Sequence, residues 1–174
     1  MEASTLSIVD NGGDQEFMGL QDYLQSYLDQ ERFRSAYFTA HQRWQEASEM
    51  LYEGDSRDSV LAAAARAREA VEEFVGVLAE KHGEIPADQG SPVATCECSF
   101  SERLSTLIES WRPQLGEARC ALLGALLDYW CALNAELQCH LQGAEQVGGP
   151  LRWEDGRRVV VLTAVLMVEI DRSL

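Results

Sequence analysis

The chain has 174 residues, of which 46% are hydrophobic, and its 29 acidic and 14 basic residues give a formal net charge of −15. This length predicts one globular domain with a sizeable core, and the apolar content excludes an intrinsically disordered chain. Because phosphate groups are bound by clustered Lys and Arg, the acidic charge also argues against a large nucleic-acid-binding face.

The cellular setting is predicted from the N-terminus and the cysteines. The stretch MEASTLSIVDNGGDQEF has neither a basic segment nor an apolar run, so no secretory signal is expected. Five cysteines, an odd number, favour free thiols and a reducing, cytoplasmic setting. The longest apolar run, residues 159–168, is too short to span a bilayer, so no membrane association is expected.

The first segment, residues 1–14, is polar, contains a Gly-Gly pair and lacks a periodic pattern. The first 31 residues hold seven acidic residues and no Lys or Arg. We therefore expect a flexible acidic tail over residues 1–14, followed by a single helical bundle domain over residues 15–174.

Two amphipathic helices are predicted next. Apolar residues recur in steps of three and four through residues 17–28 and again through residues 33–51, which is the period of an α-helix with one buried face. Gly54 is expected to end the second helix, and Asp55 or Ser56 is expected to cap the helix that follows.

The third predicted helix, over residues 60–78, has an alanine-rich first half, LAAAARAREA, whose small side chains let a neighbouring helix approach closely. Residues 83–99 contain several turn-forming residues and are expected to form a long loop. The spacing from Ser99 to Glu102 is that of a capping box and predicts a short helix that ends near Trp111.

A long helix is predicted from Pro113, which suits a first helical turn. Its buried side is expected to carry the large residues that recur along it, namely Leu115, Leu122, Leu126, Tyr129, Leu133, Leu137 and Leu141. The last helix is predicted from about Trp153 to Arg172, with a terminal strand as the alternative because residues 159–168 are rich in strand formers. The fold class is therefore all-α, a bundle of five or six helices.

Three stretches of the sequence share an order of elements with one known superfamily. They are residues 40–83, AHQRWQEASEMLYEGDSRDSVLAAAARAREAVEEFVGVLAEKHG; residues 133–143, LNAELQCHLQG; and residues 149–172, GPLRWEDGRRVVVLTAVLMVEIDR. This order resembles that of the HEPN superfamily, helical bundles found in prokaryotic toxins and antiphage systems. The resemblance implies that Glu69 takes the place of a central acidic residue, and that Asn134 and His140 align with the Asn and His of an Arg-x(4–6)-His motif.

The motif is degenerate in this chain. Active members of the superfamily use the Arg and the His, usually at a dimer interface, to cleave RNA without metal. Here the Arg position falls on Leu133, and no Arg or Lys occurs from Cys120 to Leu151. A guanidinium would stabilise the negative charge of the pentavalent phosphorane. Arg157 and Arg158 are the candidate replacements, and with Glu69 they are the predicted binding residues.

A structural interpretation of the same residues stays open. His140 follows Leu137 and Leu133 on the predicted apolar stripe, where a histidine is most often a hydrogen-bonded residue of the core or its boundary. Asn134 lies one position off that stripe and is expected to face solvent or to bond another helix.

No metal or cofactor is predicted. Cys96-x-Cys98 lacks the second pair of ligands that a zinc site needs. The thiols of Cys120, Cys131 and Cys139 are expected to be small core groups of the long helix. The carboxylates of the third helix are expected to form a solvated face, because no Glu-x-x-His repeat occurs.

Three functions compete. The preferred one is a non-catalytic helical protein-binding module, an accessory or regulatory subunit of a prokaryotic antiphage defence or toxin–antitoxin system. The second is a HEPN-type metal-independent ribonuclease that uses His140. The third is an acidic inhibitor or antitoxin that occupies a basic cleft through its N-terminal segment. The predicted partner is a protein with a basic surface, a homodimer is the alternative, and direct nucleic-acid binding is not expected.

Overall fold

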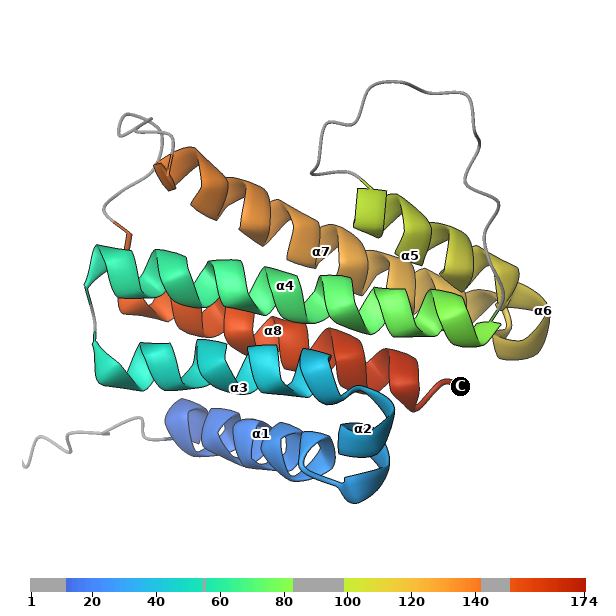
Figure 1. Cartoon of the computed structure of the whole chain (residues 1–174), viewed down its shortest axis with the longest axis horizontal. Helices are drawn as coiled ribbons and strands as arrows, with labels where there is room; N and C mark the ends of the chain where they lie inside the picture. Colours follow the sequence, from blue (N-terminus) through green and yellow to red (C-terminus); the bar gives the residue numbers. More distant parts are fainter. Residues whose placement is uncertain (1–11, 55, 83–98, 142–150) are drawn as a thin grey trace, which may run out of the picture.

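The computed structural model describes residues 12–54, 56–82, 99–141 and 151–174, and every element in these ranges is an α-helix (Figure 1). The helices are α1 (Gly12–Leu28), α2 (Glu31–Ala36), α3 (Phe38–Glu53), α4 (Arg57–His82), α5 (Ser99–Ser110), α6 (Arg112–Leu115), α7 (Glu117–Leu141) and α8 (Trp153–Asp171). The all-α prediction is confirmed, and the strand alternative for residues 159–168 is wrong. The predicted number of helices is too low, because two short helices, α2 and α6, interrupt what the periodicity joins.

The predicted helix ends agree with the structure in several places. Gly54 follows the last residue of α3, and the hydroxyl of Ser56 accepts the backbone N–H of Ser59 at 3.1 Å at the start of α4. At the N-terminus α1 begins at Gly12, so residues 12–14 of the predicted tail are helical. Residues 1–11 lie outside the described residues, and a flexible tail there stays a prediction.

Helices α3 and α4 form an antiparallel pair, and α8 packs against both (Figure 1). The alanine-rich half of α4 turns its small side chains inward, with Ala63, Ala67 and Ala70 fully buried. Close approach is also visible at Gly156 of α8, where an added Cβ would lie 2.9 Å from both Leu51 Cδ2 and Val60 Cγ1. Small residues therefore set the separation of these three helices.

Indole hydrogen bonds connect α8 to its neighbours. Trp44 Nε1 of α3 donates to the Val160 carbonyl at 3.0 Å, and Trp130 Nε1 of α7 donates to Thr163 Oγ1 at 2.8 Å. Both acceptors lie in the interior of α8, and both indoles are buried. Each bond satisfies a polar atom that burial would otherwise leave unpaired, so the register of α8 against α3 and α7 is fixed.

The buried carboxylate of Asp171 connects the N-terminal helices to the C-terminal end of α8. Asp171 is only 6% exposed, and it accepts a hydrogen bond from Tyr27 Oη at 2.7 Å and an ion pair from Arg32. Burial, reinforced by the hydrogen bond and charge of Asp171, raises the pKa of Tyr27 to about 12 against the partial opposition of Arg32. Burial, reinforced by the nearby charge of Asp171, also raises the pKa of Tyr37.

The start of α7 differs from the prediction. Pro113 does lie in a first helical turn, but that helix is α6, which ends at Leu115 and is followed by Gly116 as its C-cap. Gly116 has φ 79°, a left-handed conformation that favours glycine, and α7 then begins afresh at Glu117. Leu122 and Tyr129, predicted to be buried, are 46% and 49% exposed, and Leu123, Leu127 and Trp130 face the core instead.

Candidate functional site

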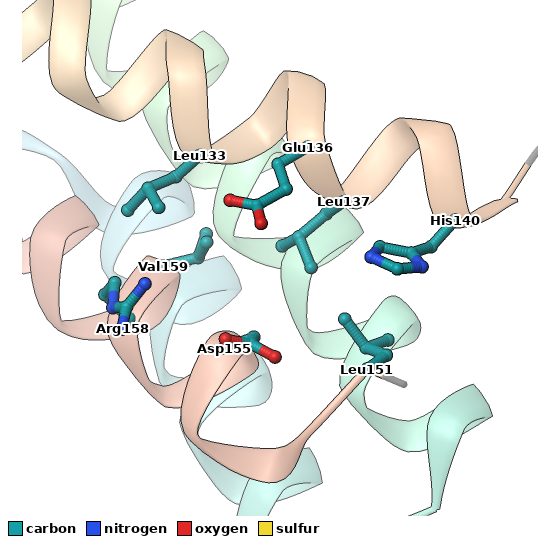
Figure 2. Close-up of a pocket in the computed structure, with 8 residues that line it drawn as sticks. All are labelled: Leu133, Glu136, Leu137, His140, Leu151, Asp155, Arg158 and Val159. Atoms are coloured by element: carbon teal, nitrogen blue, oxygen red, sulfur yellow. The ribbon is translucent and has the colours of Figure 1, made fainter. Parts of the chain in front are cut away.

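The C-terminal half of α7 and the first turns of α8 line a shallow hollow that is open to solvent and has a volume of about 10 Å³, room for about one water molecule (Figure 2). Its lining includes two of the predicted site residues, His140 and Arg158. The full lining consists of Leu133, Glu136, Leu137 and His140 from α7, Leu151 from just before α8, and Asp155, Arg158 and Val159 from the first two turns of α8.

His140 lies in the last turn of α7 and is half-buried rather than part of the core. Its side chain lies with Leu151 at one end of the hollow (Figure 2). Its backbone carbonyl, one of those that the end of a helix leaves without an intrahelical partner, accepts a hydrogen bond from Arg57 Nη2 at 2.5 Å. The residue is thus a boundary residue that helps to connect the end of α7 to the start of α4.

Arg158 shares the hollow with His140 but lies at its opposite end (Figure 2). Glu136 and Asp155 also line the hollow, so its lining contains one guanidinium and two carboxylates. The Asp155 carboxylate accepts the backbone N–H of Arg152 at 2.9 Å and thereby caps α8. Because these two carboxylates would repel a negatively charged phosphate, the hollow is poorly suited to stabilising a phosphoryl transition state.

Arg157, the other candidate replacement, points elsewhere. Its guanidinium lies 5.3 Å from the centroid of the Trp153 ring and 3.4 Å from Gln21 Oε1. The cation–π contact joins residues one helical turn apart within α8, whereas the hydrogen bond to Gln21 connects α8 to α1. The structure therefore does not bring Arg157 together with His140.

Asn134 does not face solvent or bond another helix, and that expectation is wrong. It is 8% exposed, and its Nδ2 donates to the Trp130 carbonyl at 3.1 Å, one turn earlier in the same helix. A short amide side chain satisfies itself in this way inside a helix. Asn134 does not line the hollow that contains His140.

Glu69 belongs to a cluster of ion pairs between α3 and α4. Arg66 Nη1 lies 2.5 Å from Glu69 Oε2, and Arg43 Nε lies 3.5 Å from the same oxygen. Glu46 pairs with both arginines at 3.1 Å and 3.5 Å. The carboxylate of Glu69 is thus matched by charges of this chain, and it does not line the hollow.

Among the residues that the structure describes, no group of three or more His, Cys, Asp or Glu is placed to hold a metal ion. Cys96 and Cys98 lie outside those residues. The prediction that the thiols of the long helix are core groups holds for Cys120, which is buried, but Cys131 is half-buried and Cys139 is exposed. The N-terminal segment of the inhibitor hypothesis is also only partly described, so that hypothesis stays a prediction.

The feature that the sequence analysis missed is the outer face of α7, which lies at the edge of the bundle (Figure 1). The side chains exposed along it are mostly small or apolar. They are Ala118, Ala121, Leu122, Ala125, Asp128, Tyr129, Ala132, Ala135, Glu136 and Cys139. From residue 120 to residue 135 the only charged side chain is that of Asp128. The scarcity of charged residues over this stretch is the signal in the sequence that predicts an apolar outer face.

By length and composition, residues 117–140 of α7 also meet the criterion for a membrane-crossing helix, with a mean hydropathy of 1.2 and 39% of the most apolar window buried. No other helix in the described ranges meets it. The core helix of a soluble protein meets the same criterion, so the observation itself marks α7 as unusually apolar rather than as membrane-bound.

The chain matches no protein-family model, no curated protein and no solved structure at a significant level. The HEPN-like order of elements therefore stays a resemblance, and the function is argued from the geometry of the chain itself.

Proposed function

We propose that this protein is a non-catalytic helical module that binds another protein through the outer face of α7. The observation that carries the proposal is the exposure of Leu122 and Tyr129, 46% and 49%, on a helix whose exposed side chains are otherwise mostly alanine. Contiguous apolar surface of this kind is typical of interaction sites.

The favourable free energy of binding is expected to come from the burial of apolar side chains. Full burial of an apolar side chain contributes about 1.5 to 3 kcal/mol, so covering two half-exposed side chains contributes roughly 1 kcal/mol each. The alanines add little area of their own, but they let a partner helix lie close to the backbone of α7, at an interaxial distance of about 8 Å. The face is therefore suited to another helix rather than to a small ligand.

The experiment compares two charge insertions on different faces. Leu122→Glu places a carboxylate on the outer face of α7, whereas Phe38→Glu places one at the start of α3, where Phe38 is 65% exposed. Tagged wild-type and variant proteins are used to isolate partners from native extract, with circular dichroism as the folding control. We expect a partner that wild type and Phe38→Glu retain and Leu122→Glu loses. Equal recovery by all three would exclude α7 as the binding face.

The accessory or regulatory role in a prokaryotic defence or toxin–antitoxin system rests on the HEPN resemblance. The genes beside this one test it. A neighbouring nuclease, helicase or nucleotidyltransferase would support that role, and neighbours of unrelated metabolism would count against it.

A ribonuclease is the second candidate, because His140 and Arg158 line one hollow. The test is RNA cleavage by purified wild type and by His140→Ala and Arg158→Ala. Cleavage that both substitutions abolish would replace the non-catalytic proposal. We expect no cleavage that depends on His140, because Glu136 and Asp155 line the same hollow.

A further inference from the structure

We draw no further inference here: the strongest candidate, the exposed apolar patch on the outer face of α7, belongs to the site already proposed, and nothing in the part of the chain that the structure describes shows what covers it.

Discussion

Two alanine-rich helices of this molecule differ in whether their alanine side chains are buried. In α4, Ala63, Ala67 and Ala70 have no exposed surface, because α4 packs closely with α3 and α8. In α7, Ala121 and Ala132 are exposed, because no described helix covers that side. The residue type is the same and the spacing is similar. An alanine stripe therefore indicates where a helix approaches closely, and it is covered only where a partner is present.

The exposed surface also differs between the two helices. The outer side of α4 carries alternating charges that pair with α3, as in the pairs of Arg66 with Glu46 and of Glu69 with Arg43. The outer side of α7 has one charged residue over the stretch from 120 to 135. Water solvates the first surface well, whereas the second exposes apolar area.

The largest expected effect on the free energy of unfolding comes from enlarging an alanine in α4, compared with the same change in α7. Ala67→Leu adds three carbons to a site without exposed surface and should lower the free energy of unfolding by about 2 to 3 kcal/mol. Ala125→Leu makes the same change on α7 and should change it by less than about 0.5 kcal/mol. Urea unfolding at a concentration where the protein is monomeric measures both. Equal losses would show that α7 is covered in the monomer.

Glycine substitutions test close approach in the same way. Gly156→Ala forces a Cβ to 2.9 Å from Leu51 and Val60, both buried, and should destabilise the fold by about 1 to 2 kcal/mol. Gly76→Ala in α4 meets nothing within 4 Å and should stabilise it by about 0.5 to 1 kcal/mol. Thermal unfolding of the two variants should therefore shift in opposite directions, and a stable Gly156→Ala protein would contradict the packing of α8.

Alkaline pH tests the covered junction at Asp171. The folded protein holds the pKa of Tyr27 at about 12, above the ordinary value of 10, so the neutral phenol is the favoured form. The stabilisation is complete below pH 10 and is lost as the pH rises from about 10 to about 12. Denaturant unfolding across this range should show the loss, and Tyr27→Phe should reduce it. Tyr129→Phe on the outer face of α7 should leave it unchanged.

The smallest effect is expected for the ion pairs of α3 and α4. Glu69→Gln removes a carboxylate that is 43% exposed, and solvent screens such pairs. We expect a loss of less than about 1 kcal/mol in urea unfolding, decreasing further at high salt. A loss much larger than this would show that the cluster, and not the alanine packing, holds α3 against α4.

The elements of this fold were largely predictable, whereas the orientation of α7 was not. Helices such as α3 have one apolar side, so periodicity alone assigns their buried residues. α7 has apolar residues on all sides, so its sequence fits several rotations equally well, and its packing against α5 and α8 decides among them. Leu122 and Tyr129 were misplaced for this reason. The sequence predicted that His140 and Asn134 belong to one site, and only His140 lines the hollow. Which side of α7 Asn134 occupies depends on the rotation of the helix, which its sequence does not determine.

The order of synthesis gives α8 a particular importance. It follows every helix on which it packs, α1, α3, α4 and α7, and it contributes Asp171 to the N-terminal junction. The sides of those earlier helices that α8 covers therefore have no partner within this domain until α8 has left the ribosome. Folding of this domain is completed only after α8 emerges, and a product truncated before α8 would leave the surfaces that α8 covers open to chaperones and proteases.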